Sequence, residues 1–289
     1  MKPIRKVVVP VAGLGTRVLP ATKSIPKEML TVVDRPLIDY NLEEAREAGV
    51  EHFIFVTGRG KGAIEDYFDH AYELEETLSA KGKTAFLDDL KARMPRAGEV
   101  SYTRQQRPLG LGHAVWCARE IVGEEPFAVL LPDEIVGGKP GYLKQMITAY
   151  EKTGGNLIAV EEVPLEETKK YGVIKPKADA KDGVVPMTGM VEKPDPADAP
   201  SRLRVIGRYI LQPEIFPLLA KQGAGAGGEI QLTDAMDKLL ADQDFHGVLC
   251  QGAIHDCGSK LGWLKANVEL GLKREDIGAE FAAFLKELR

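Results

Sequence analysis

The sequence predicts an α/β protein in which a Rossmann-like, mostly parallel sheet is flanked by helices and joined by a smaller antiparallel lobe. Strand-like and helical periods alternate along the first half of the chain, as they do in parallel sheets with helices on both faces. A run of valines leads directly into a glycine turn, and ligands of such folds bind beyond the carboxyl ends of the strands. After Val163 the character changes, because short strands then alternate with loops of Pro, Asp and Ala.

The predicted strands of the first part are Val7–Val11, His52–Thr57, Val100–Arg104, Phe127–Leu131 and Leu157–Val160. Apolar residues recur at helical spacing between them, which predicts helices at Leu37–Ala48, Gly112–Val122 and Tyr142–Lys152. Gly49 is expected to end the first of these helices, and Gly154-Gly155 the last. Residues 70–98 are polar and helix-prone, and we expect them to form a helical insertion on the surface.

The second part is predicted to contain the strands Gly172–Lys175, Met190–Lys193 and Arg204–Leu211, followed by helices at Glu229–Ala241 and Lys260–Gly271. One apolar stripe marks the last helix, and it consists of Ile277, Phe281, Phe284, Leu285 and Leu288. We expect this amphipathic helix to dock on its own domain, with a contact to another subunit as the alternative.

Composition excludes several classes of function. The chain has 289 residues, of which 44% are hydrophobic and 28% charged, so it is large enough to bury a full core. A net charge of -5 without blocks of Lys or Arg argues against a nucleic-acid partner. No apolar run approaches the ~20 residues that span a membrane, and no signal-peptide pattern is present, so we expect a cytoplasmic protein. Three widely spaced cysteines indicate neither a disulfide framework nor a zinc site.

The turn after the first strand is typical of a phosphate cradle. Gly13 and Gly15 let the backbone approach an anion closely, and successive N–H groups in such a turn can hold phosphate oxygens. Arg17 adds a guanidinium suited to bidentate phosphate contacts. Ten residues further on, Lys27 follows Pro26, which stiffens the segment and presents a second cation. The alternatives are a plain tight turn and a lysine that only pairs with its neighbour on the surface.

Neither of the two common nucleotide motifs fits this turn. The Walker A pattern requires Gly-Lys-Ser/Thr, whereas Thr16-Arg17 follows the second glycine here. The dinucleotide fingerprint requires a third glycine where this chain has Val18, and Asp34 stands in a predicted turn rather than at the end of a second strand. These departures argue against an NAD-dependent Rossmann enzyme.

The glycine turn and the lysine segment resemble those of the sugar-1-phosphate nucleotidylyltransferases, and most of all those of the bacterial UTP–glucose-1-phosphate uridylyltransferases. The resemblance begins with AGLGTR and IPKEML and extends in order along nearly the whole chain. Its further segments are Arg104-Gln105 with Pro108–Ala114, Leu130–Asp133, Lys170–Val173, Val191–Pro194, Gly228–Asp234 and His255–Gly258.

The resemblance implies that UTP and glucose 1-phosphate react to UDP-glucose and pyrophosphate by direct attack on the α-phosphorus. It also implies one domain over residues 1–289, with a nucleotide-binding part (1–163), a sugar-binding part (164–258) and C-terminal helices (259–289). Family members are commonly dimers or tetramers, so we expect a homo-oligomer, and we favour a tetramer. The work of the protein would be to position the reactants and to neutralise their charge.

Carried onto this sequence, the resemblance implies a role for each motif residue. Arg17, Lys27 and Lys193 would be the catalytic cations. The nucleotide would lie against Ala12, Gly13, Gly15, Thr16, Gln105 and Gly110, and the sugar against Gly172, Glu192 and Glu229. Asp133 and Asp256 would hold Mg²⁺.

Each of these roles has a plainer alternative. A lone Asp is more often a turn or capping residue, and a Glu-Lys pair on a strand contributes little. Gln105 beside a glycine-rich turn is usually structural, Gly172 can mark a simple turn, and Glu229 can cap a helix. His113 and His255 lack a Ser or Cys partner at a recognisable spacing, so we interpret both as structural or supporting residues.

Other functions stay open beside uridylyl transfer. Thymidylyl or adenylyl transfer to glucose 1-phosphate belongs to the same class, although the insertion and the loop Ala21–Lys27 resemble the uridylyl branch. A non-catalytic nucleotide-sugar sensor on the same fold would be expected to lack a metal carboxylate or a phosphate cation, and this chain has them all.

Overall fold

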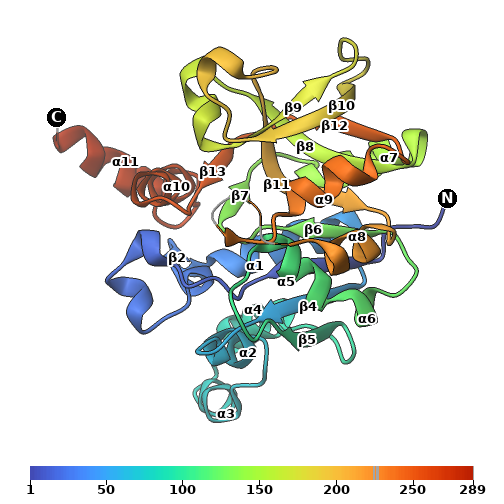
Figure 1. Cartoon of the computed structure of the whole chain (residues 1–289). Coiled ribbons are helices and arrows are strands. Elements are labelled where there is room, and N and C mark those ends of the chain that lie inside the picture. Colours follow the sequence, from blue (N-terminus) through green and yellow to red (C-terminus); the bar gives the residue numbers. More distant parts are fainter. Residues whose placement is uncertain (224, 226–227, 289) are drawn as a thin grey trace.

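The computed structural model describes residues 1–288 except 224, 226 and 227, and within them nine strands form one sheet (Figure 1). In spatial order these strands are β5 (Val100–Arg104), β4 (His52–Thr57), β1 (Lys6–Pro10), β6 (Phe127–Leu130), β11 (Leu203–Leu211), β8 (Asn156–Glu162), β12 (Phe245–Leu249), β10 (Val184–Glu192) and β9 (Gly172–Pro176). The predicted α/β class is confirmed.

The sheet changes from parallel to mixed along this order. Strands β5, β4, β1 and β6 pair in parallel, as the alternating pattern predicts. Strand β11 is antiparallel to both of its neighbours β6 and β8, and β10 is antiparallel to β12 and β9. The second part is therefore mostly antiparallel as expected, with β12 parallel to β8, but its strands extend the same sheet instead of forming a separate one.

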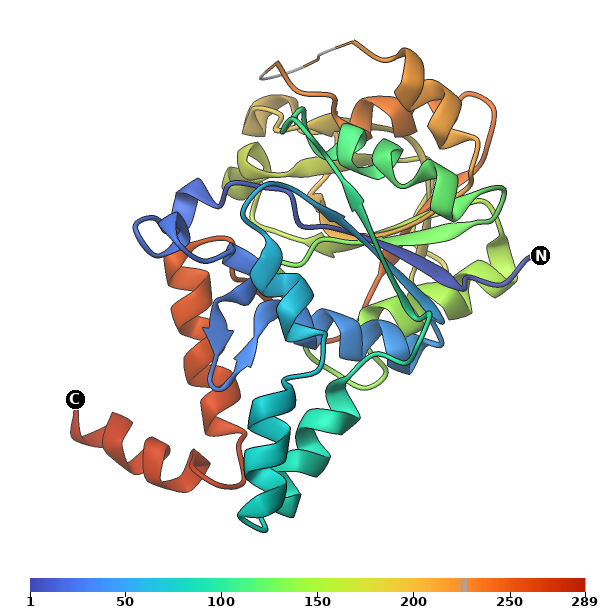
Figure 2. The same ribbon diagram turned by 90° about the horizontal axis from the view of Figure 1, so that it is seen from below.

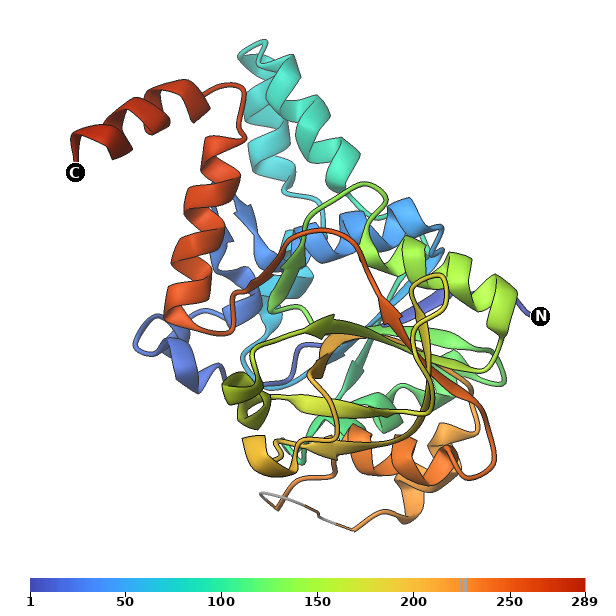
Figure 3. The ribbon, with the colours of Figure 1, turned by 90° about the horizontal axis from the view of Figure 1, so that it is seen from above.

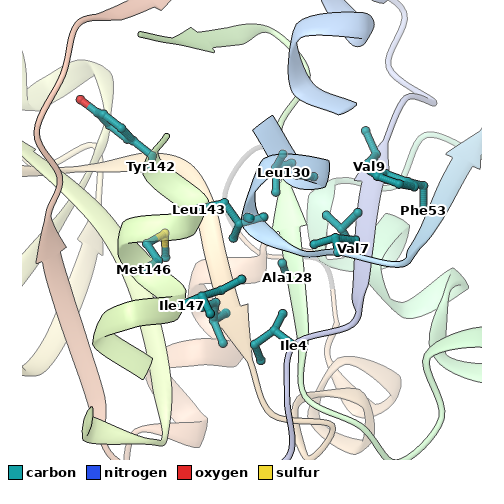
Figure 4. Packing of buried hydrophobic residues seen from close by; sticks show 14 of the residues in the cluster. Ile4, Val7, Val9, Phe53, Ala128, Leu130, Tyr142, Leu143, Met146 and Ile147 are labelled. Atoms are coloured by element: carbon teal, nitrogen blue, oxygen red, sulfur yellow. The ribbon is translucent and has the colours of Figure 1, made fainter. Parts of the chain in front are cut away.

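Helices cover both faces of the sheet because the valines of β1 are buried on both sides. Val7 and Val9 face a cluster formed with α1 (Leu37–Ala48) and α7 (Tyr142–Thr153), which Figure 4 shows. Val8 faces the opposite cluster with α5 (Leu111–Cys117) and α9 (Leu232–Leu239). Strands buried on two faces read as continuous apolar runs. Each fully buried aliphatic side chain contributes about 1.5–3 kcal/mol, so this layer holds β1 and its turn rigidly.

The predicted helices agree with the structure in most places. Helix α1 has the predicted bounds and ends at Gly49, which has a φ of 96°. The predicted helix at 112–122 is divided at Ala118 into α5 and α6 (Arg119–Val122). The polar segment forms α3 (Tyr72–Ala80) and α4 (Thr84–Arg93), which contain no buried residue and project from the body (Figure 2). The remaining elements are α2 (Gly62–Tyr67), α8 (Ile215–Lys221), α10 (Lys260–Leu272), β2 (Thr31–Val32), β3 (Arg35–Pro36), β7 (Glu134–Val136) and β13 (Ile254–Asp256).

The last helix, α11 (Gly278–Glu287), extends away from the sheet (Figure 3). Phe281 lies against Gly271 of α10, but Phe284 and Leu288 are 51% and 66% exposed. The expectation that the whole stripe docks on its own domain is therefore wrong, because these two side chains stay largely exposed. Over the described residues, no helix combines the length and the apolar character that crossing a bilayer requires.

Candidate active site

The carboxyl ends of β1 and β6 lie side by side because the two strands are parallel neighbours. The glycine turn follows β1, and Asp133 follows β6 after Leu131-Pro132. Gly15 has a φ of 65°, a conformation that a side chain strains. A Cβ on Gly13 would meet no protein atom within 4 Å, so the protein itself leaves open space above this residue. The turn thus presents bare backbone toward the edge where such sheets bind ligands.

Two adjoining cavities open at this edge. The first, of about 530 Å³, is lined by the glycine turn, Lys27 and Gln105. The second, of about 230 Å³, is lined by residues of the antiparallel part, among them Lys193. Arg17 and Asp133 line both cavities and mark their junction.

Every site residue expected from the sequence lines one of these cavities. The first contains Ala12, Gly13, Gly15, Thr16, Arg17, Lys27, Gln105, Gly110, Asp133 and Glu229. The second contains Arg17, Asp133, Gly172, Glu192, Lys193 and Asp256. Glu229 was expected beside the sugar residues, but it lies in the other cavity next to Gly110. A Cβ on Gly110 would approach the Cβ of Glu229 to 2.8 Å, so this glycine also serves close packing.

Lys27 forms an ion pair with Asp133 at the junction, with 2.7 Å between Nζ and Oδ2. Burial lowers the pKa of Lys27, but the charges of Asp133 and Glu28 outweigh this effect and the net shift is upward. Burial likewise raises the pKa of Asp133, and the charge of Lys27 reverses the shift, so that the pKa of Asp133 is lowered. Both groups are therefore held in their charged forms.

A second, buried ion pair anchors the segment that carries Lys27. Glu28 is fully buried, and its Oε2 accepts from Nζ of Lys61 at 2.8 Å. Burial raises the pKa of Glu28, and the charge of Lys61 opposes this. Lys61 follows β4, so the pair joins two loops that are 33 residues apart. The alternative in which Lys27 only pairs with its neighbour on the surface does not hold, because Glu28 is buried and pairs with Lys61. Lys61 was not predicted from the sequence, although its position after a buried strand was a signal.

Gln105 is buried beside the glycine turn, and its amide has a fixed orientation. Its Nε2 lies 3.0 Å from the carbonyl oxygen of Gly110 and 3.0 Å from Nδ1 of His113. Because a carbonyl oxygen cannot donate, the atom that faces Gly110 must be the amide nitrogen. Both N–H groups are then used within the protein, and Oε1 has no donor among the described residues. Gln105 therefore offers a ligand a hydrogen-bond acceptor and no donor.

Asp133 and Asp256 lie close enough to share a cation. A Cβ on Gly258 would lie 2.9 Å from Oδ2 of Asp133 and 3.0 Å from Oδ1 of Asp256. The space between the carboxylates thus stays open because residue 258 has no side chain. Strand β13 pairs Asp256 with Glu134, which fixes the spacing through the backbone. Two carboxylates that leave room for phosphate and water oxygens suit Mg²⁺. No group of three or more His, Cys, Asp or Glu side chains adds to such a site among the residues described.

Lys193, which lines the second cavity, has an unusual backbone conformation. It follows β10 with a φ of 49°, in the left-handed region that non-glycine residues rarely adopt. Its N–H donates to the carbonyl oxygen of Tyr171, which holds this backbone in place. Its Nζ lies 3.3 Å from Oε1 of Glu192, and its side chain is 55% exposed. Strained residues of this kind cluster at functional sites.

The second cavity also contains charged groups that the sequence did not reveal. Glu134 lines it, and its Oε2 accepts from the N–H of Gly207 at 2.6 Å. Burial raises the pKa of Glu134 to about 7, against the opposing charge of Arg208. Arg204 does not line the cavity itself, but its guanidinium lies over the ring of Tyr171, which does, 4.5 Å from the ring centroid. The one signal for Glu134 was a second carboxylate directly after Asp133.

The histidines and cysteines have supporting positions, as expected. His113 contacts Gln105, and His255 is buried with its Nε2 3.8 Å from Glu269. Burial raises the pKa of Cys257 to about 12, so its thiol stays protonated. No histidine or cysteine lines either cavity within the described part of the chain.

Comparisons with known proteins decide the family. Residues 6–271 match the nucleotidyl transferase family. The chain belongs to this family. A UTP–glucose-1-phosphate uridylyltransferase of Komagataeibacter xylinus is 53% identical over 262 residues, which are 90% of this chain and 92% of that protein.

Two solved structures share the fold over nearly the whole chain. A UTP-bound UGPase from Acinetobacter baumannii is 46% identical, with a TM-score of 0.92, and the match covers 99% of this chain and 100% of that one. A UDP-glucose pyrophosphorylase in complex with UDP-glucose is 44% identical, with a TM-score of 0.86, over 94% of this chain and 100% of that one. The resemblance expected from the motifs is confirmed.

Proposed function

We propose that the protein transfers the uridylyl group of UTP to glucose 1-phosphate, forming UDP-glucose and releasing pyrophosphate. The observation that carries this proposal is the junction of the two cavities. Arg17 and Asp133 line both a cavity with a phosphate turn and a cavity with a strained lysine beside a carboxylate. A reaction between two phosphate groups needs such a shared boundary, with a cation and a candidate metal ligand beside both reactants. The names of the relatives, which include uridylyltransferases and a UTP-bound structure, support the same choice.

In this proposal the first cavity holds UTP. The N–H groups of the turn at Gly13–Thr16 and the guanidinium of Arg17 hold the triphosphate, and Lys27 neutralises its charge. The acceptor Oε1 of Gln105 faces the N3–H of uracil. Cytosine has an acceptor at that position, so the same geometry disfavours it. These groups bind UTP in an orientation that exposes its α-phosphorus to the second cavity.

The second cavity holds glucose 1-phosphate, with Lys193 on the phosphate and Glu192 on sugar hydroxyl groups. A phosphate oxygen of the sugar attacks the α-phosphorus of UTP. The bond from that phosphorus to the β-bridging oxygen breaks, and pyrophosphate leaves with the electron pair. The attacking phosphate is already an anion, so no base has to remove a proton. This agrees with the lack of histidine along both cavities in the described residues.

We further propose that Asp133 and Asp256 hold Mg²⁺, which would stabilise the negative charge on the reacting phosphates. The opening beside Gly258 and the two carboxylates fit this ion. Asp133 would then interact with both the cation and Lys27. The positive charge of Lys27 would also offset the repulsion between the two carboxylates before the cation binds. The predicted homo-oligomer and cytoplasmic location stay predictions.

A panel of nucleotides and sugar phosphates tests the proposal. Pyrophosphate release should be fastest with UTP and glucose 1-phosphate and should require Mg²⁺. Turnover with dTTP should be lower by about tenfold or more, because dTTP has an additional methyl group, for which that discrimination is usual, and lacks the 2′-hydroxyl group of UTP. CTP should react more slowly still. Robust turnover with dTTP but not with UTP would contradict the uridylyl assignment, and nucleotide-sugar binding without any pyrophosphate release would favour the sensor.

A further inference from the structure

Among the described residues, the largest fully buried side chain is charged. It belongs to Arg208 of β11, which is 0% exposed and lines neither cavity. Its partner is Glu44 of α1, whose Oε2 lies 2.8 Å from Nη2 and 3.0 Å from Nε. Asn41, one turn earlier on α1, accepts from Nη2 at 2.9 Å. We call Arg208, Glu44 and Asn41 the buried cluster.

The buried cluster binds the backbone on either side of Asp133. Arg208 donates from Nη1 to the carbonyl oxygen of Leu131 at 3.1 Å and from Nη2 to that of Glu134 at 2.9 Å. The amide nitrogen of Asn41 donates to the carbonyl oxygen of Pro132 at 3.1 Å. We call the segment from Leu131 to Glu134 the Asp133 loop.

The remaining carbonyl of the Asp133 loop faces the second carboxylate strand. The carbonyl oxygen of Asp133 accepts from the N–H of Cys257 at 2.8 Å, directly beside Asp256. Every carbonyl oxygen of the Asp133 loop is therefore held, three of them by the buried cluster and one by the chain next to Asp256. These hydrogen bonds restrict rotation of the peptide groups in the loop. The buried cluster therefore helps to fix the direction in which the Asp133 side chain points.

Stability does not explain why a charged group stands at this position. Desolvation largely offsets the attraction within a buried ion pair, and apolar residues of similar volume often replace such pairs without loss. What an apolar side chain cannot supply is a planar set of five N–H donors. Arg208 uses this set to connect α1, β11 and the Asp133 loop, which are far apart in the sequence.

We propose that Arg208, held by Glu44 and Asn41, is a positioning residue that fixes the Asp133 loop and thereby the divalent-cation site of the reaction. The inference rests on the proposed role of Asp133 as a cation ligand. The buried cluster touches neither substrate. It acts as the hydrogen-bond partners behind metal ligands do, whose loss typically weakens metal binding or activity by about 10- to 100-fold.

Two variants separate the geometry of the cluster from its charge. Arg208→Lys keeps a cation beside Glu44 but cannot reach both carbonyl oxygens of the loop. The double variant Arg208→Met with Glu44→Leu removes both charges together, so no unpaired charge stays buried. Arg46→Met is the control, because Arg46 lies on α1, the helix that carries Glu44, and pairs with a different glutamate, Glu99, neither of which lines a cavity.

Binding of Mn²⁺ alone to each folded protein, measured by the EPR signal of the free ion, is the primary readout. Both Arg208 variants should keep the circular dichroism spectrum of the wild type and bind Mn²⁺ about 10- to 100-fold more weakly. In steady state, kcat should fall and the Mg²⁺ concentration needed for half activity should rise, while KM for glucose 1-phosphate stays unchanged. Arg46→Met should resemble the wild type in every measurement.

Wild-type Mn²⁺ affinity in both folded Arg208 variants would overturn the inference, as would an equal loss in Arg46→Met. If the double variant does not fold, Arg208→Lys decides. If neither folds, Asn41→Ala decides by the same readout, because it removes the donor to Pro132. Asp133→Asn is measured in parallel. If this variant is fully active, the proposed cation site is wrong. If it loses most of its activity while both Arg208 variants bind Mn²⁺ normally, the cation site stands and only the positioning role of Arg208 is wrong.

Discussion

The two cavities of the site differ in how the chain builds them. The first combines one short turn, where Gly13 and Gly15 expose the backbone, with side chains such as Gln105 from later in the chain. The second is assembled from β7, β9, β10, β11 and β13, which are spread over more than a hundred residues. The first cavity thus uses backbone donors on a rigid strand end, whereas the second uses side chains held by long-range pairing. In the proposed function, the first cavity would recognise the triphosphate and the second would recognise the sugar phosphate.

The cavities also differ in how they hold their charges. Lys27 is matched by Asp133, and Glu28 by Lys61, so the first cavity holds these charges in close ion pairs. Lys193 is instead half exposed and sits on a strained backbone, beside a carboxylate at 3.3 Å. An ion pair whose charges neutralise each other holds its two side chains in place. An exposed cation attracts an incoming anion more strongly. Three substitutions test this division.

The largest effect is expected at the junction, for Asp133→Asn. It removes the charge that both cavities share, and we expect kcat to fall by about 10²–10³-fold, the range for loss of a preorganised electrostatic group. Pyrophosphate release at saturating substrates and Mg²⁺ measures this. Asp198→Asn, at an exposed position of the second part, should leave kcat unchanged. If the Asp133 variant is folded and fully active, the junction is not where the chemistry takes place.

Local signals predicted much of the fold. Helix α1 and strand β4 have their predicted bounds, because Gly49 and Gly58 end uninterrupted apolar patterns. Strand β12 was missed, since Gly247 in its centre weakens any strand signal. A Cβ at Gly247 would lie 2.7 Å from Cδ1 of Ile174, so packing between strands requires the glycine that hides the strand. The exposure of α11 could not be predicted from the sequence either, because an apolar stripe on a helix does not show which part of the protein covers it.

The site shows the same limit. Motif residues such as Gly15 and Asp133 stand at strand ends and were found from the sequence. The groups that hold them were not, because Arg208 and Glu44 are 164 residues apart and Lys61 and Glu28 are 33 apart. Such pairs become visible only when the fold buries both partners. The sequence also left open which half of the Gln105 amide faces a ligand, and the carbonyl of Gly110 decides it.

A smaller effect, confined to one cavity, is expected for Lys193→Ala. Deleting a cation that faces the sugar phosphate should raise KM for glucose 1-phosphate by roughly 10- to 100-fold, since hydrogen bonds to charged groups contribute about 1.5–3 kcal/mol. KM for UTP should stay near the wild-type value. Lys177→Ala, which removes an exposed lysine beyond the end of β9, is the control. A change in KM for UTP alone would place Lys193 in the other cavity and end the division drawn above.

The smallest effect concerns the orientation of Gln105 in the first cavity. Neutral His113 accepts an amide N–H of Gln105 at its Nδ1, and protonation removes that acceptor. Burial lowers the pKa of His113 from its ordinary 6.5, and burial raises the pKa of the neighbouring Cys117, so both stay neutral at pH 7. The acceptor is therefore present above pH 6.5 and is lost as the pH falls below it.

KM for UTP should accordingly be flat from pH 8 to 6.5 and rise at lower pH by about 2- to 10-fold, the contribution of one neutral hydrogen bond of about 0.5–1.5 kcal/mol. In His113→Asn the Oδ1 atom accepts without titrating, so the rise should disappear, while KM for glucose 1-phosphate follows the same profile in both proteins. If the rise persists in His113→Asn, another group titrates and the histidine does not orient the amide. If it appears equally in KM for glucose 1-phosphate, the two cavities are not recognised separately.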